Sequence, residues 1–181
     1  MKIAITGHAS GIGYETFNLL QHTHECVGFD KENGHNICDD VFVDQITDDF
    51  DCFVNNAYHQ SYQERILLQL YNRWRDTNKI IVNIGSMVSV YPQSFELINE
   101  LHGTWSQKYM EDKISFMQTH RRLSYECWIN KYNVQLKMLF PGATDTALLK
   151  DLDIEKAHPK KVALAIKQLI DQTDYQELVV W

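Results

Sequence analysis

Three glycines follow a short apolar run at the start of the chain, and their spacing suits a phosphate-binding turn. The run KIAIT ends at Thr6, and the stretch GHASGIG follows at positions 7–13. Between a strand and a helix, such glycines permit a tight bend and a close approach of a pyrophosphate to the backbone. The helix N-terminus adds free N–H groups and a partial positive charge. The turn therefore predicts a dinucleotide site, and the alternative is a structural turn that binds nothing. The predicted cofactor-binding residues of this turn are Gly7, Ser10, Gly11, Ile12 and Gly13.

A carboxylate ends the next apolar run, CVGFD, at Asp30. Such a residue can accept hydrogen bonds from the ribose hydroxyls of the adenosine and would repel a 2′-phosphate. It therefore favours NAD over NADP, and the lack of a basic residue in the glycine turn favours the same choice. Lys31 follows directly and weakens this preference. The alternative is an aspartate that is simply solvated at the end of a strand.

One tyrosine of the chain, Tyr109, is followed four residues later by a lysine, Lys113. Both stand in a stretch from 106 to 131 that has no proline or glycine and predicts a long helix. On a helix, residues i and i+4 share one face, so these two side chains can point into one pocket. The alternative is a tyrosine and a lysine on the solvated face of an amphipathic helix.

The elements that must position these residues alternate along the chain. Short apolar runs predict strands over 2–6, 26–30, 36–38, 51–55, 79–85, 133–140 and 177–181. Helical spacing of apolar residues predicts helices over 11–21, 61–76, 106–131 and 159–170, while 88–101 is hard to assign. Such alternation implies parallel strands joined by crossover helices on both faces of one sheet. We therefore predict an α/β, doubly wound Rossmann fold, with three αβα layers, about seven mainly parallel strands and one domain over 1–181.

Composition sets limits on the class of protein. The chain has 181 residues, a net charge of −7, 44% hydrophobic residues and 23% charged residues. These values are ordinary for a soluble globular protein and exclude a disordered or collagen-like chain. The acidic balance argues against a nucleic-acid-binding surface. No apolar stretch approaches the roughly 18 residues of a membrane span, and the N-terminus lacks the features of a secretory signal.

The four cysteines stand too far apart in the sequence for a zinc motif or a dense disulfide framework. They are Cys26, Cys38, Cys52 and Cys127. Free thiols in a reducing cytoplasm are the simplest interpretation, and we expect no metal site.

Taken in order along the chain, these motifs resemble those of the short-chain dehydrogenase/reductase family, and the resemblance covers nearly the whole sequence. The glycine turn matches the family's, VNNA at 54–57 resembles its NNAG segment, and VNIGS at 82–86 resembles the strand that delivers its active-site serine. YMEDK at 109–113 matches the YxxxK motif, and PGATDT at 141–146 resembles the turn that holds the nicotinamide carboxamide. Asp39 resembles the carboxylate that contacts the adenine.

The resemblance implies an NAD(P)-dependent oxidoreductase that transfers a hydride between nicotinamide and a secondary alcohol or carbonyl. It implies a small-molecule substrate, with no nucleic-acid or membrane partner, and a homodimer or homotetramer paired through the helices at 61–76 and 106–131. Its implied catalytic residues are Ser86, Tyr109 and Lys113. Beyond the glycine turn and Asp30, its implied cofactor-binding residues are Asp39, Asn55, Ala57, Tyr109, Lys113, Pro141, Thr144 and Thr146.

These residue types suit that chemistry. Hydride addition to a carbonyl leaves an alkoxide that needs a proton, and a phenol with an ordinary pKa of about 10 must be adjusted to supply it. One cationic lysine at about 5 Å contributes roughly 3 kcal/mol, or about two pKa units, at an effective dielectric of 20. Tyr109 would then act as general acid or base near neutral pH, with Lys113 lowering its pKa. Ser86 would orient the substrate oxygen, and we prefer it to Ser89 because it directly follows a strand.

The sequence departs from the family at several places. Tyr58 replaces the glycine of NNAG, so its ring could crowd the cofactor, or His59 could enter the site. The stretch between Ser86 and Tyr109 is longer than the family's common spacing and is expected to border the substrate pocket. The asparagine that often completes the family's proton relay has no obvious counterpart. Its weak candidates are Gln60, Gln63, Gln69 and Asn72.

These departures keep a second interpretation open, that of a non-catalytic dinucleotide-binding sensor or interaction protein with the same fold. A sugar-nucleotide epimerase is a weaker third interpretation, because the glycine spacing of those enzymes usually differs.

Overall fold

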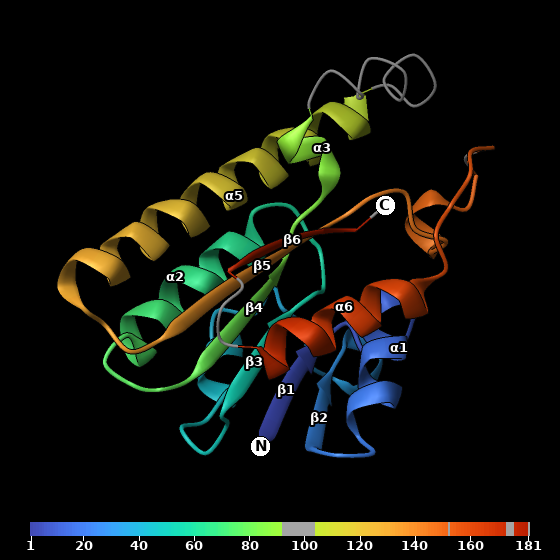
Figure 1. Ribbon diagram of the computed structural model, residues 1–181. Helices are drawn as coiled ribbons and strands as arrows, with labels where there is room; N and C mark the ends of the chain where they lie inside the picture. Colours follow the sequence, from blue (N-terminus) through green and yellow to red (C-terminus); the bar gives the residue numbers. More distant parts are fainter. Residues whose placement is uncertain (92–103, 152, 173–175, 181) are drawn as a thin grey trace.

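The computed structural model describes residues 1–91, 104–151, 153–172 and 176–180 (Figure 1). Its described strands form one six-stranded sheet, in which every neighbouring pair is parallel. The strand order is β2-β1-β3-β4-β5-β6. The strands are β1 (Lys2–Thr6), β2 (Glu25–Phe29), β3 (Cys52–Asn55), β4 (Ile80–Ile84), β5 (Gln135–Pro141) and β6 (Glu177–Val180).

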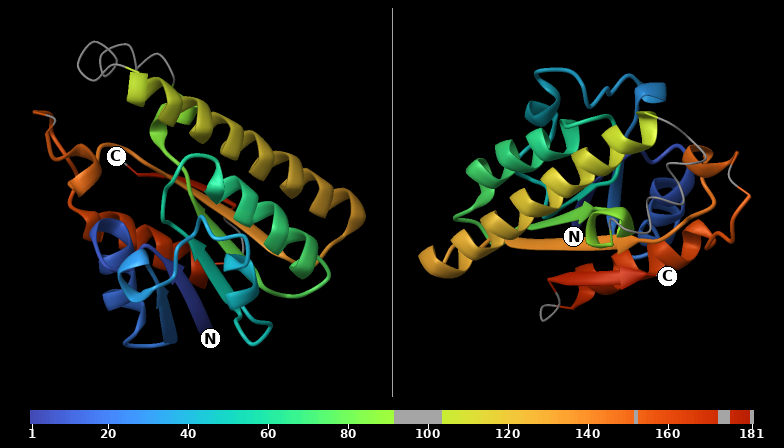
Figure 2. Two further views of the ribbon diagram at one scale, coloured as in Figure 1. Left: turned by 180° about the vertical axis from the view of Figure 1, so that it is seen from behind. Right: turned by 90° about the horizontal axis from the view of Figure 1, so that it is seen from above.

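Helices cover both faces of this sheet, as Figure 2 shows from above. Helices α2 (Tyr62–Trp74) and α5 (Thr104–Asn130) lie on one face, and α1 (Gly11–Leu20) and α6 (Pro159–Asp171) lie on the other. A single turn, α3 (Met87–Val90), follows β4. The predicted three-layer, doubly wound Rossmann fold is therefore confirmed. Most of the longer stretch between Ser86 and Tyr109 lies outside the described residues.

The prediction of about seven strands is wrong, because the predicted strand at 36–38 forms a turn. The side chain of Asn36 accepts a hydrogen bond from the backbone N–H of Cys38 at 3.0 Å, and this local bond competes with pairing to a sheet. The segment instead contains two 3₁₀ helices, η1 (Lys31–Asn33) and η2 (Phe42–Gln45). Ile37, Phe42 and Ile46 of this segment are buried in the core, whereas Val41 is exposed.

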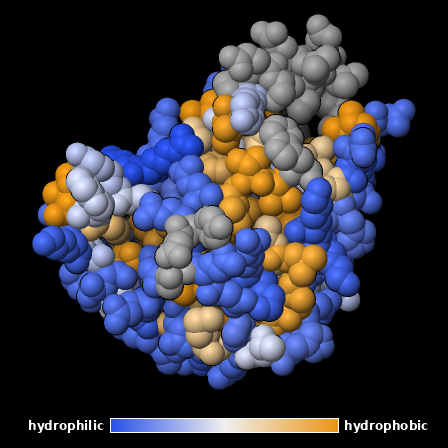
Figure 3. All heavy atoms as spheres, in the orientation of Figure 1, coloured by the Kyte–Doolittle hydropathy of each residue, from blue (hydrophilic) through white to orange (hydrophobic). Residues whose placement is uncertain are grey.

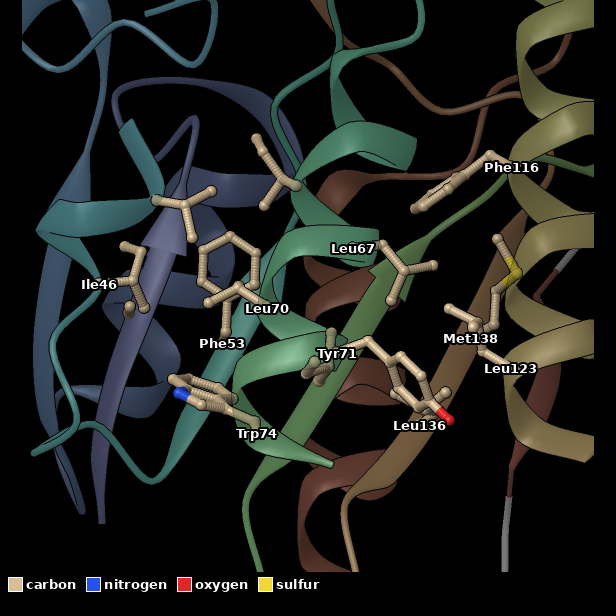
Figure 4. Close-up of a cluster of buried hydrophobic side chains, with 14 of the residues drawn as sticks. Ile46, Phe53, Leu67, Leu70, Tyr71, Trp74, Phe116, Leu123, Leu136 and Met138 are labelled. Atoms are coloured by element: carbon tan, nitrogen blue, oxygen red, sulfur yellow. The ribbon is translucent and has the colours of Figure 1, made fainter. Parts of the chain in front are cut away.

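Alternation along the strands divides the core into two parts. In β3, Phe53 packs beneath α2 and α5, whereas Cys52 and Val54 belong to the cluster on the opposite face. This is the period of two that side chains follow along a strand. The larger cluster is drawn in Figure 4, where Trp74 and Tyr71 of α2 lie over the sheet. Burial of such large side chains fixes α2 and α5 on the sheet.

Parallel pairing brings the carboxyl ends of all the strands to one edge of the sheet. The chain leaves β1 toward β2 on one side, while β3 pairs with β1 on the other side. Ligands of doubly wound sheets bind at such a reversal of strand order. The glycine turn follows β1, Asn55 ends β3, and Ser86 follows β4. The predicted site residues therefore gather at the edge where a ligand is expected.

No helix of the described part of the chain is both long and apolar enough to cross a membrane. All four cysteines are free, and Cys52 is buried.

Gly28 of β2 gives a test of this packing. A β-carbon at this position would lie 2.2 Å from the imidazole ring of His8, which packs near Phe17. We expect Gly28→Ala to lower the free energy of unfolding by about 1–3 kcal/mol, because the well-packed ring cannot move away without strain. Urea denaturation measures the loss. Introducing His8→Ala beside Gly28→Ala should recover most of it, and failure to recover would contradict this explanation.

Candidate active site

The glycine turn has a backbone that glycine alone adopts easily. Gly7 has a φ of +69° and Gly11 a φ of +55°. A β-carbon on Gly13 would lie 2.0 Å from the carbonyl oxygen of Gly7, so this position needs glycine to close the turn. Ser10 precedes α1 but makes no side-chain cap, so it leaves the helix N-terminus to other acceptors. The turn therefore fits the pyrophosphate of a dinucleotide.

The end of β1 is joined to the segment after β3 through one hydroxyl. The Thr6 Oγ1 donates to the Val54 carbonyl at 3.2 Å and accepts from the backbone N–H groups of Asn56 at 2.9 Å and Ala57 at 3.0 Å. The Asn56 side chain donates to the Thr6 carbonyl at 2.9 Å. The structure therefore brings Ala57 beside Gly7, as the resemblance implies. It adds Asn56, which the sequence analysis did not include among the site residues.

The segment after β5 also reaches the glycine turn. A β-carbon on Gly11 would lie 3.1 Å from the Cγ2 of Thr146. Thr144 is buried, and its hydroxyl donates to the Gly142 carbonyl at 3.0 Å. Pro141 is the buried last residue of β5. These predicted cofactor residues therefore lie along one segment, which reaches the glycine turn at Thr146.

The two acidic candidates lie in the segment that follows β2. Asp30 is partly buried and caps η1, with its Oδ1 accepting from the backbone N–H of Glu32 at 3.1 Å. Asp39 is exposed, and its carbonyl accepts from the N–H of Phe42. Asp30 therefore takes part in a capping box at the start of η1, and its ribose contact stays a prediction.

Ser86 and Tyr109 come together at the end of β4. Ser86 is buried and caps α3, with its Oγ accepting from the N–H of Val88 at 3.4 Å. The Tyr109 hydroxyl is hydrogen-bonded to Ser86. The Ser89 hydroxyl instead donates to the Ser86 carbonyl at 2.6 Å. Of the two serines, Ser86 is therefore the one that meets the phenol.

Lys113 is buried beside them, with 3% of its surface exposed. Its Nζ donates to the Gln63 Oε1 at 2.7 Å and to the Ile84 carbonyl at 2.9 Å. Burial lowers the pKa of this ammonium to about 7, although the charge of Asp112 opposes the effect.

The pKa of Tyr109 differs from the expectation based on sequence. Burial raises this pKa, and the hydrogen bond to Ser86 offsets the rise only in part. The lowering expected from Lys113 is not present in the structure. The physical reason is that burial penalises the tyrosinate and the lysine cation alike.

Gln63 is the relay candidate that the structure brings to Lys113. It stands at the first turn of α2, and its Nε2 donates to the Asn55 carbonyl at 2.9 Å. Gln60, Gln69 and Asn72 are exposed. The signal in the sequence is a polar residue in the first turn of a helix, on the face that is otherwise apolar and buried.

Buried polar side chains continue this network across the sheet. The Asn55 Nδ2 donates to the Asn83 Oδ1 at 3.1 Å, and Asn83 contacts the His120 Nδ1 at 3.2 Å. Burial lowers the pKa of His120 to about 4, so its ring is neutral near pH 7. Asn83 stands in the VNIGS segment but was not predicted as a site residue, and His120 has no motif of its own.

Tyr58 lies against the site but is not a second candidate acid. Its hydroxyl donates to the Asp112 Oδ2 at 3.0 Å, and its ring meets the Tyr109 ring edge-on at 4.9 Å. Burial and Asp112 raise the pKa of Tyr58. His59 is exposed and packs near Tyr62. In the described part of the chain, no group of three or more His, Cys, Asp or Glu could hold a metal ion.

No family model and no curated protein sequence matches this chain. Solved structures do. A 3-alpha-hydroxysteroid dehydrogenase from Pseudomonas sp. B-0831 complexed with NADH superposes with a TM-score of 0.77 and 21% identity, over 99% of this chain and 95% of that one. The chain has the fold of the short-chain dehydrogenases/reductases.

Two more structures of that fold are similar to this chain. A 3-ketoacyl-(acyl-carrier-protein) reductase from Brucella melitensis complexed with NADH gives a TM-score of 0.74 at 16% identity, over 99% of this chain and 96% of that one. A short chain dehydrogenase from Burkholderia cenocepacia J2315 in complex with NADP gives 0.77 at 11% identity, over 99% and 87%. The short-chain dehydrogenase/reductase fold therefore extends over nearly the whole chain.

The burial of Lys113 predicts a pH dependence of stability. Its pKa is about 7 in the folded protein and 10.5 without burial, so between these values the unfolded chain binds more protons. Raising the pH through this window therefore stabilises the folded protein, by at most about 1.4 kcal/mol per pH unit. Urea denaturation from pH 7 to 9 should show this gain relative to Lys113→Met. Lys150→Met, at an exposed position, is the matched control, and parallel curves for the unmodified protein and Lys113→Met would contradict the assignment.

Proposed function

We propose that this protein is an NAD(P)-dependent oxidoreductase of the short-chain dehydrogenase/reductase family, acting on a secondary alcohol or carbonyl. One observation favours this above others. The Tyr109 phenol is hydrogen-bonded to Ser86, and the Lys113 Nζ lies 5.6 Å from the centre of the Tyr109 ring. The same edge of the sheet holds a glycine turn that fits a pyrophosphate. A proton donor, a hydroxyl and an anion-binding turn therefore face one site.

Each residue has a role in this proposal. A bound reduced nicotinamide supplies the hydride to the carbonyl carbon. The Ser86 hydroxyl orients the substrate oxygen, and Tyr109 gives that oxygen its proton in reduction and takes the proton back in oxidation. Lys113 stands beside the phenol, where Gln63 and the Ile84 carbonyl hold its Nζ, and is proposed to bind the cofactor together with Tyr109.

NAD is the preferred cofactor in this proposal. Asp30 directly follows β2, where its carboxylate can bind the ribose hydroxyls and repel a 2′-phosphate. Similar structures bind NADH or NADP, so the preference depends on this carboxylate and on Lys31 beside it.

We also propose that two copies pair through α2 and α5, as the resemblance implies. On α5, Trp128 is 75% exposed and stacks on Tyr125, which is 62% exposed, and Ile129 extends the apolar surface. Exposed apolar surface of this kind marks contacts between proteins.

The proposal includes a single domain in the cytoplasm, where the four free thiols stay reduced.

Tyr109→Phe tests the proposed reaction. The phenylalanine keeps the ring but has no proton to give, so turnover of ketones and aldehydes with NADH should fall by about 100- to 10,000-fold. NADH affinity, measured by fluorescence titration, should remain within about twofold. Turnover is followed by the loss of reduced-nicotinamide absorbance over a substrate panel, with NADH and NADPH compared.

Tyr125→Phe, at an exposed position of the same helix, is the matched control and should keep full activity. NADH binding without turnover in the unmodified protein would favour the non-catalytic sensor instead. Absence of binding would overturn both.

Trp128→Glu tests the proposed pairing. A buried, unpaired carboxylate would oppose association, so the variant should elute as a monomer where the unmodified protein elutes as a dimer or tetramer. Size-exclusion chromatography with light scattering measures the mass. Val41→Glu changes an exposed apolar residue outside these helices and should leave the mass unchanged. An unmodified protein that is monomeric at micromolar concentration would refute the pairing.

A further inference from the structure

Tyr58 places a large aromatic ring where the family's NNAG segment has glycine. This ring packs against residues of the site. Its centre lies 4.9 Å from that of the Tyr109 ring, with the planes at 78°. This is an edge-to-face pair, a geometry that fixes the relative orientation of two rings. The ring that would donate the proton therefore has a second ring against it.

The Tyr58 ring is itself held at its outer end. Its hydroxyl donates to the Asp112 Oδ2 at 3.0 Å. Asp112 is buried, and its other oxygen accepts from the Lys108 Nζ at 2.8 Å. A buried carboxylate with both oxygens engaged is a firm anchor. This anchor links the segment after β3 to α5, the helix of Tyr109 and Lys113.

Tyr58 also covers the catalytic lysine. The Lys113 Nζ lies 5.2 Å from the centre of the Tyr58 ring, 5.6 Å from that of Tyr109 and 5.8 Å from that of Phe116. Cations at such distances are attracted to aromatic faces. Three rings and two oxygen acceptors therefore surround the ammonium, and Tyr58 is the member of this set that comes from the loop after β3.

We propose that Tyr58 is a positioning residue of this site: Asp112 holds its ring, and its ring orients Tyr109 and covers Lys113. The proposal rests on the oxidoreductase function proposed above. Tyr58 does not exchange a proton with the substrate, because its hydroxyl is already donated to a carboxylate. Its contribution is to turnover, while cofactor affinity depends mainly on the glycine turn.

The kinetic test uses Tyr58→Phe, Asp112→Ala and the double variant. Tyr58→Phe keeps the ring and loses its anchor, so kcat should fall about tenfold, the equivalent of one hydrogen bond to a charged group. KM for NADH should stay within about twofold. Asp112→Ala should reproduce the loss, and the double variant should add little to it, because the two side chains act through one contact. Asp112→Asn, which keeps an acceptor for Tyr58, should restore most of the activity.

A second readout needs no substrate. In Tyr58→Ala, the uncovered Lys113 should react with acetic anhydride at neutral pH at least about tenfold faster than in the unmodified protein, because the amine loses its aromatic cover. Mass spectrometry of peptides follows this single site. Leu164→Ala, at an exposed position of α6 away from the site, is the control and should leave the labelling unchanged.

The two readouts separate this proposal from the proposed reaction. Unchanged kcat in Tyr58→Phe, or additive losses in the double variant, would overturn the positioning role. Unchanged labelling of Lys113 in Tyr58→Ala would show that the Tyr58 ring does not cover Lys113. If Tyr58→Ala does not fold, the comparison of Tyr58→Phe with Asp112→Asn decides the matter. If the unmodified protein turns over no substrate, the proposed reaction fails, and labelling still decides whether Tyr58 covers Lys113.

Discussion

A buried ammonium is the constraint on which the site depends. Lys113 has almost no contact with solvent, so its charge must be stabilised by the groups around it. Two oxygen acceptors do this, one from the first turn of α2 and one from the end of β4. Their positions follow from the packing of α2 and α5 on the same face of the sheet. The chemistry of the site therefore depends on the placement of two helices as much as on any motif.

The second constraint lies at the ends of the strands. Parallel pairing brings the carboxyl ends of β1, β3 and β4 to one edge of the sheet. Thr6, at the end of β1, is hydrogen-bonded to the segment that follows β3. These hydrogen bonds are partly buried or buried, and they keep the glycine turn in a fixed relation to the polar groups beside it. Figure 3 shows that apolar atoms also gather on the molecular surface over β6, at the far end of this sheet. The sheet thus has polar groups at the carboxyl ends of its strands and an apolar surface at its outermost strand, β6.

Much of this arrangement could be predicted from the sequence. The apolar runs around Ile3, Val54 and Val82 have the length and composition of buried parallel strands, and the structure confirms them. The helix of Tyr109 and Lys113 was predictable because no glycine or proline interrupts it. The strand at 36–38 was wrong because a side chain, Asn36, supplied a local bond that periodicity does not reveal.

Contacts between distant positions account for what the sequence could not show. Gln63 was one of four weak candidates, and its choice depends on where α2 begins relative to α5. The contact of Tyr58 with Asp112, far along the chain, could not be read from the sequence either. The balance of pKa values required the degree of burial, which raised the pKa of Tyr109 where charge alone predicted a fall.

Helix α5 connects two regions of the molecule, the candidate site and an exposed aromatic surface. Tyr109 and Lys113 stand near its beginning, and the stacked pair of Tyr125 and Trp128 stands near its end. At 1.5 Å per residue the helix is about 40 Å long, and it has no break that would absorb a displacement. A partner bound at Tyr125 and Trp128 would therefore contact the same unbroken helix that carries Tyr109 and Lys113.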